Sequence, residues 1–147
     1  MTPAAQFPDD SAIESLVIRV LDASLPRAEW THAAHFALAL WLLTHRPADF
    51  SPEDFRRIIR ALNDAQGTAN TDSSGYHHTI TIASIEAARA ALAGQGEGIP
   101  LHAVLALLMA GTHGRSDWIL AHWSRPRLFS IEARRDWLGP DLAPLPF

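Results

Sequence analysis

The chain has 147 residues, of which 48% are hydrophobic and 19% charged, and this composition excludes a disordered chain and predicts one globular domain. The formal net charge of −4 argues against nucleic acid as a partner, because phosphate backbones are bound by basic faces. The absence of cysteine excludes disulfides and thiolate ligands, so any metal site must be built from nitrogen and oxygen atoms.

The start of the chain and its apolar segments predict a cytoplasmic protein. Residues 1–8 contain neither a basic segment nor an apolar run, so we expect no signal peptide. The longest apolar run, residues 36–43, is far shorter than the ~20 residues that a membrane helix requires. We therefore expect a soluble protein that makes no membrane contact.

Apolar residues at helical spacing predict helices along almost the whole chain. In chain order, the expected helices span approximately residues 10–24, 28–45, 52–67, 76–92, 101–112, 116–125 and 130–138. Ser51 and Pro52 form a clear helix start, with the serine as N-cap and the proline in the first turn. Residues 36–43 are apolar on all sides, which is typical of a central helix.

Loops and a tail complete the expected architecture. Residues 68–75 form a polar loop with turn-forming residues, and prolines keep residues 139–147 extended. The β-branched residues 79–82 allow a strand, but the alanine-rich segment that follows favours helix. We therefore expect an all-α, single-domain helical bundle over residues 1–147, with four longer helices, some short ones and a proline-rich C-terminal tail.

Histidines in two distant segments predict a metal site. His32 and His35 are three residues apart, which places both side chains on one helix face. His77 and His78 begin another expected helix, where neighbouring side chains diverge by about 100°, so we expect one of them, preferably His77, to join the same ion. Three imidazoles with open positions are typical of a catalytic site, and such ligands suit Zn, Fe, Ni, Cu or Mn.

Structural roles for these histidines stay open as alternatives. One of the first pair would then be a hydrogen-bonded core residue, and the second pair would cap a helix or face solvent. The metal is favoured because several imidazoles in alanine- and leucine-rich surroundings must each find a partner. Glu29 is a candidate ligand, orienting residue or general base, and Tyr76 is a candidate hydrogen-bond donor to a metal-bound species.

Arginines are frequent in the last third of the chain. They are Arg115, Arg125, Arg127, Arg134 and Arg135. A guanidinium that faces a pocket would hold a substrate carboxylate or phosphate in a bidentate grip, whereas a solvated face that balances nearby acids is the simpler interpretation.

Three blocks of the sequence resemble a group of short bacterial helical proteins of uncharacterised function. The shared patterns are W-T-H-x-x-H within residues 29–35, G-Y-H-x-T-I-T within residues 75–81, and P-D-L-x-P-L-P within residues 127–146. The resemblance implies that His32, His35 and His77 belong to one functional unit. At the level of the fold, the expected bundle is similar to DinB-like helical bundles, which hold one metal with histidines from different helices.

These observations predict a metal-dependent enzyme that acts on a small molecule. Arginines near the site would allow this substrate to be an anion. One divalent transition metal would activate water, dioxygen or a substrate oxygen, and Glu29 would move protons. The polar loop over residues 68–75 would gate the pocket. The alternative is a non-catalytic helical module that binds a metal or a ligand. If a stripe of apolar residues is left exposed on the helices, two copies of the chain would form a homodimer through it.

Overall fold

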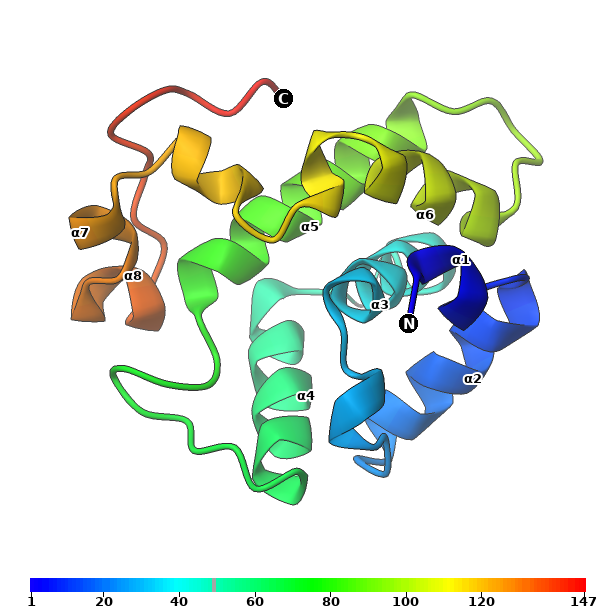
Figure 1. Cartoon of the computed structure of the whole chain (residues 1–147), viewed down its shortest axis with the longest axis horizontal. Helices are drawn as coiled ribbons and strands as arrows, with labels where there is room; N and C mark the ends of the chain where they lie inside the picture. The colour runs from blue at the N-terminus through cyan, green and yellow to red at the C-terminus, as the bar shows by residue number, and fades with distance from the viewer. Residues whose placement is uncertain (49) are drawn as a thin grey trace.

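The computed structural model describes residues 1–48 and 50–147, and this part of the chain consists of helices and connecting loops (Figure 1). The longest helices are α2 (Asp10–Leu21), α3 (His32–His45), α4 (Pro52–Ala65), α5 (His78–Ala93) and α6 (Leu101–Ala110). The all-α prediction is confirmed, with five longer helices in the described residues rather than four. Residues 79–82 lie inside α5, so the strand alternative is wrong.

The bounds of the shorter helices differ from the expected ones near Pro126 and at Asp136, where the backbone is extended. The shorter elements are α1 (Pro3–Gln6), α7 (Arg125–Leu128), α8 (Ile131–Arg135) and three 3-10 turns, η1 (Arg27–Glu29), η2 (Thr112–Gly114) and η3 (Trp118–Ala121). The expected helix over residues 116–125 is instead η3 followed by α7, because Ser124 caps a new helix that holds Pro126 in its first turn. The last helix ends at Arg135, since Asp136 is extended.

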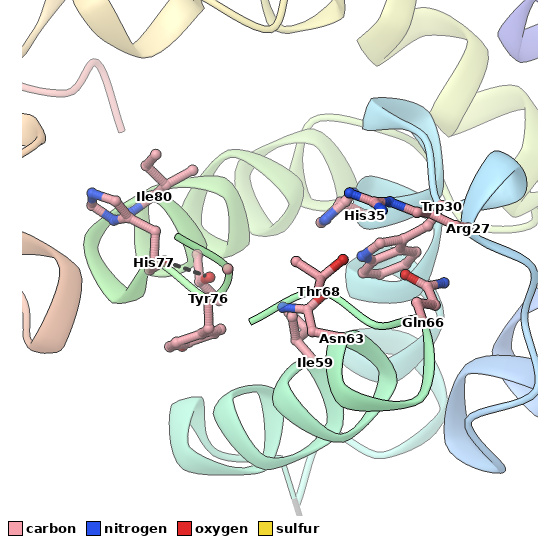
Figure 2. A pocket seen from close by; sticks show the side chains of 12 residues that line it. Arg27, Trp30, His35, Ile59, Asn63, Gln66, Thr68, Tyr76, His77 and Ile80 are labelled. Carbon is pink, nitrogen blue, oxygen red and sulfur yellow. Dashed lines mark hydrogen bonds between the residues drawn. The ribbon is translucent and has the colours of Figure 1, made fainter. Parts of the chain in front are cut away.

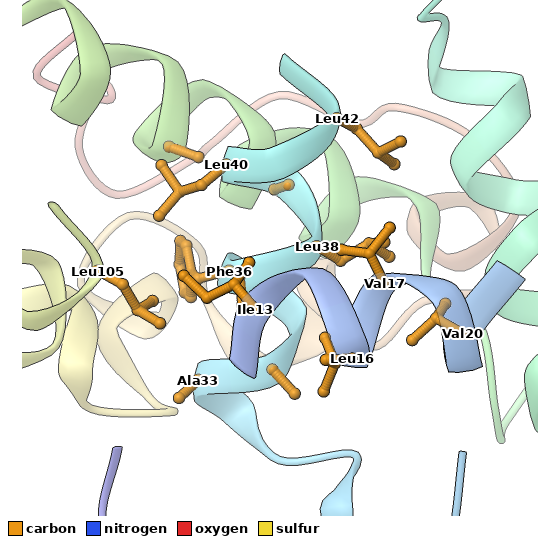
Figure 3. Close-up of a cluster of buried hydrophobic side chains, with 14 of the residues drawn as sticks. Ile13, Leu16, Val17, Val20, Ala33, Phe36, Leu38, Leu40, Leu42 and Leu105 are labelled. Atoms are coloured by element: carbon orange, nitrogen blue, oxygen red, sulfur yellow. The ribbon is translucent and has the colours of Figure 1, made fainter. Parts of the chain in front are cut away.

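Helix α3 is the centre of the fold, as its apolar sequence predicts. Eight of its fourteen residues are buried, and it packs against α2, α5 and α6. Figure 3 shows side chains of α2 and α3 meeting in one cluster with Leu105 of α6. Burial of a side chain such as Leu38 or Leu40 stabilises the fold by roughly 1.5–3 kcal/mol. The core therefore fixes the face of α3 from which the histidines project.

Helix α4 begins where the sequence predicts. Ser51 and Asp54 form a capping box, in which the serine hydroxyl accepts the backbone N–H of Asp54 and the carboxylate accepts the backbone N–H of Ser51. The apolar face of this helix buries Phe55, Ile59 and Leu62 against the core. None of the helices in residues 1–48 and 50–147 is long and apolar enough to cross a membrane.

A second, smaller core attaches the C-terminal segment to α5. Trp123 and Leu128 are fully buried beside Ala83. The indole N–H of Trp123 donates a hydrogen bond to the carbonyl of Leu138 at 2.8 Å. Helix α8 also packs against α5, so the C-terminal segment is held next to the start of α5, where His77 and His78 lie (Figure 1).

Candidate functional site

Two neighbouring hollows lie beside the first turn of α3. The larger one, here called the His35 cleft, has a volume of about 490 Å³ and is drawn in Figure 2. Its lining residues are Arg27, Trp30, His35, Ile59, Asn63, Gln66, Thr68, Gly75, Tyr76, His77, Ile80 and Thr81. The smaller one, the apolar pocket, has a volume of about 190 Å³. Both hollows are lined by His35, Ile59, Ile80 and Thr81, so they lie next to each other.

The ring of His35 is held in one orientation. Thr31 caps α3, and its carbonyl lies 2.8 Å from Nδ1 of His35 one turn later. A carbonyl oxygen only accepts hydrogen bonds, so Nδ1 carries the proton and Nε2 carries the lone pair. The indole of Trp30 stacks on the ring, with 3.8 Å between the ring centroids. Sequence spacing identifies His35, but this tautomer follows only from the structure.

The surroundings of His35 favour the neutral ring. Loss of hydration lowers the pKa of His35 below its ordinary value of 6.5, and the nearby ring of His32 lowers it further, against the opposing effect of the hydrogen bond to Thr31. The side chain is still exposed to the cleft on one side, where water moderates the size of this effect. Because the pKa of His35 is shifted downward from 6.5, the ring is uncharged at pH 7 and has an available lone pair.

The ring of His32 is also held by a hydrogen bond to a backbone carbonyl. Its Nε2 donates to the carbonyl of His113 at 2.7 Å, which places the lone pair on Nδ1. The ring lines the apolar pocket and packs edge-on against Phe36. Within residues 1–48 and 50–147, neither Nδ1 of His32 nor Nε2 of His35 has a hydrogen-bond partner. One helix face therefore offers two imidazoles, each with a free nitrogen.

His77 lies at the other end of the His35 cleft, across from His35 (Figure 2). Its Nε2 donates to the carbonyl of Leu128 at 2.7 Å, and its Nδ1 accepts the backbone N–H of Ile80 at 3.2 Å as the N-cap of α5. Both ring nitrogens are thus engaged, and coordination of a metal by His77 would require at least one of these hydrogen bonds to break. Coordination by His77 stays a prediction.

Tyr76 and His78 form a buried pair. The Tyr76 hydroxyl lies 2.7 Å from Nδ1 of His78, and Tyr76 also lines the His35 cleft, whereas His78 does not line it. Burial raises the pKa of Tyr76 to about 12, so its hydroxyl keeps its proton at pH 7. Burial lowers the pKa of His78, with the charge of Arg56 adding to the effect. The pair is a neutral hydrogen-bond unit at the wall of the cleft.

Glu29 is engaged away from the cleft. Both of its carboxylate oxygens lie 3.0 Å from Nη1 of Arg19, which links η1 to α2. Neither hollow is lined by Glu29. A general-base role for Glu29, which stays a prediction, would require the carboxylate to leave Arg19 and reach a substrate.

The residues of the predicted metal centre are only partly brought together. The pair His32 and His35 shares the apolar pocket, and His35 shares the cleft with His77. In the part of the chain that the structure describes, no three His, Cys, Asp or Glu side chains are grouped so that they could hold a metal ion. Sequence reasoning missed Arg27 and Gln66 as lining residues, because neither belongs to a motif.

Comparison with known proteins adds no relatives. No protein-family model, curated protein or solved structure matches this chain. The resemblance to short bacterial helical proteins therefore stays a prediction, and function has to be inferred from the geometry of the site.

Proposed function

We propose that this chain binds a small organic molecule in the His35 cleft and the adjoining apolar pocket. The observation that carries the proposal is the position of His35, which lines both hollows and has a lone pair on Nε2 with no protein partner in the described residues. The larger hollow, about 490 Å³, falls within the roughly 300–1,000 Å³ of small-molecule sites. The neutral imidazole would accept a hydrogen bond from a hydroxyl or N–H group of the ligand.

The linings of the two hollows suggest the chemistry of the ligand. Phe36, Phe55 and Ile85 line the apolar pocket, which suits an aromatic ring or a branched alkyl group. Arg27 and Gln66 line the His35 cleft, where a carboxylate would find the guanidinium of Arg27 and the second amide hydrogen of Gln66, whose Nε2 already donates to the carbonyl of Leu25. The ligand is thus an amphiphilic molecule with an apolar end, a donor group at its middle and an anionic head.

The same nitrogen can perform proton transfer. A general base needs an unprotonated nitrogen within hydrogen-bond reach of the proton that it removes. His35 has this form at pH 7, because its pKa is lowered and Thr31 holds its other nitrogen. In an enzymatic version of the proposal, His35 therefore accepts the proton of a bound hydroxyl or water.

The binding proposal is tested with a matched pair of histidines on α3. His45 donates from Nδ1 to the carbonyl of Trp41, four residues earlier, and stacks on that indole, as His35 does with Thr31 and Trp30. It lines neither of the two hollows. We expect hydroxylated aryl carboxylates, screened by NMR, to shift the signals of Trp30 and His35. His35→Ala should weaken their affinity about tenfold or more, and His45→Ala should leave it unchanged.

The contrary result is equally specific. Compounds that bind His35→Ala as tightly as the unmodified chain would show that Nε2 does not recognise them. Signals that shift only outside the two hollows would place the ligand elsewhere. Either result would overturn the proposal, and circular dichroism of both variants shows whether the fold is retained.

A divalent metal centre is the second proposal, favoured by one observation. His32 and His35 each donate one ring N–H to a backbone carbonyl and leave the other nitrogen free, as metal-bound histidines commonly do. We propose that these two nitrogens would begin the site, with His77 as the third ligand only if its ring is released. A bound Zn, Fe, Ni, Cu or Mn ion would act as a Lewis acid on water or a substrate oxygen.

Metal titration of the same variants separates the two proposals. Binding of Zn²⁺ or Co²⁺ in a 1:1 ratio, lost in His32→Ala and His35→Ala and kept in His45→Ala, supports the metal centre. Additional loss in His77→Gln assigns the third ligand. If no variant changes metal binding, the metal centre is excluded. The small-molecule proposal is tested separately, by the NMR experiment with hydroxylated aryl carboxylates.

A further inference from the structure

We propose that a separate hollow between α4, the loop at residues 70–72 and α8 binds a phosphate group. This hollow, here called the arginine pocket, has a volume of about 180 Å³ and is lined by the side chains of Arg56, Arg60, Arg134 and Arg135. It is smaller than the roughly 300–1,000 Å³ of typical small-molecule sites, which suits a single anionic group. The proposal does not depend on the function of the His35 cleft.

Only two of the four arginines of the arginine pocket form ion pairs with carboxylates. Asp72 pairs with Arg135 through two bonds of 2.7 Å, and Glu53 pairs with Arg56 at 3.0 Å. In the described part of the chain, Arg60 and Arg134 form no ion pair with a carboxylate. Two of the four guanidinium groups that line the pocket therefore have no carboxylate partner in the described residues, which leaves them available to the two charges of a phosphate dianion.

Arg134 presents an unused bidentate edge. Its Nη1 donates to the carbonyl of Gly75 at 3.1 Å and lies 3.4 Å from that of Tyr76, so the backbone already fixes the side chain. Its Nε is buried without a partner, and its Nη2 forms no hydrogen bond within the described residues. Arg135 uses the same Nε and Nη2 edge to grip Asp72. Leaving a buried donor unpaired is unfavourable, and an anion that enters between the guanidinium groups would offer this edge acceptor oxygens.

The rest of the arginine pocket supports an anion and links it to the cleft. Arg135, with Arg134 adding to it, lowers the pKa of Asp72, as expected in a positive field. Arg56 lies over the ring of Tyr76, with 5.3 Å from its guanidinium carbon to the ring centroid. Tyr76 lines both this pocket and the His35 cleft. A phosphate held here would therefore lie behind the wall of that cleft.

The test is titration with inorganic phosphate by calorimetry, at constant ionic strength maintained with chloride. We expect saturable 1:1 binding, at least tenfold weaker in Arg60→Gln and lost in Arg134→Gln. Arg60 is exposed and its guanidinium makes no protein contact among the described hydrogen bonds and ion pairs, so Arg60→Gln should fold normally. Arg89→Gln, at an exposed arginine of α5 outside the pocket, is the matched control and should bind normally.

Two further titrations identify the source of the phosphate. Tighter binding of glycerol 3-phosphate than of inorganic phosphate indicates an organic phosphate, and the reverse order indicates the free ion. Non-saturable binding of phosphate, or equal binding by Arg60→Gln and the unmodified chain, would overturn the proposal. Binding only of a single-stranded RNA oligonucleotide would also overturn it in favour of a polyanion surface.

Discussion

Replacement of His77 by alanine is expected to lower the free energy of unfolding by about 2–4 kcal/mol. The residue is 7% exposed, and its ring uses both nitrogens, one toward the carbonyl of Leu128 and one toward the N–H of Ile80. The alanine variant leaves a buried acceptor and a helix-terminal donor unpaired. It also removes one of the contacts that attach the C-terminal segment to the start of α5. Urea unfolding followed by circular dichroism measures the loss.

Two variants control this prediction. His77→Asn keeps an N-cap acceptor for Ile80 but cannot reach Leu128, so it should lose about half as much stability as His77→Ala. His45→Ala removes an exposed imidazole of α3 and should cost less than about 0.5 kcal/mol. A loss below about 1 kcal/mol in His77→Ala, measured without metal, would show that the two hydrogen bonds do not hold this ring. His77 would then be free to act as a ligand.

Replacement of Gly75 by alanine is expected to cost about 2–4 kcal/mol. Gly75 has a φ of +76°, which side chains disfavour, and an added Cβ would lie 2.5 Å from the carbonyl oxygen of Ala69 and 2.9 Å from the Cα of Asn70. The carbonyl of Gly75 also accepts from Arg134. The variant should therefore also weaken phosphate binding in the arginine pocket.

Gly67 provides a matched control for Gly75. Its φ is +78°, but a Cβ built there meets no atom within 4 Å. Gly67→Ala should therefore cost only about 1 kcal/mol, the conformational part of the penalty. Equal losses of stability in the two glycine variants would mean that the loop before Tyr76 relaxes around the methyl group. The close contact between Gly75 and Asn70 would then not fix the conformation of this loop.

The sequence predicts where the helices lie better than it predicts which parts of the chain they contact. The apolar residues 36–43 identify the central helix, and Ser51 identifies the start of α4, because both signals are local. The single helix expected over residues 116–125 is wrong, because Pro126, the residue that follows this range, does not end a helix but lies in the first turn of α7. Local patterns do not distinguish a proline that ends one helix from a proline that begins the next.

The candidate site shows the same division. The spacing of His32 and His35 correctly predicts a shared helix face, since that depends on helix geometry alone. No local pattern reveals that His77 meets Leu128, 51 residues later, or that Glu29 pairs with Arg19. Such contacts depend on how the helices pack, and they decide which nitrogen or oxygen atoms are free to meet a ligand.

Long-range ¹H–¹⁵N NMR of the His35 ring is the most direct test of the central claim. The predicted result at pH 7 is a neutral ring with its proton on Nδ1 and a pKa below 6.5, in the unliganded and metal-free chain. Because its pKa lies below 6.5, the His35 ring should still be mainly neutral at pH 6.5. A proton on Nε2, or a ring already charged at pH 7, would contradict the claim, because the cleft would then contain no imidazole lone pair.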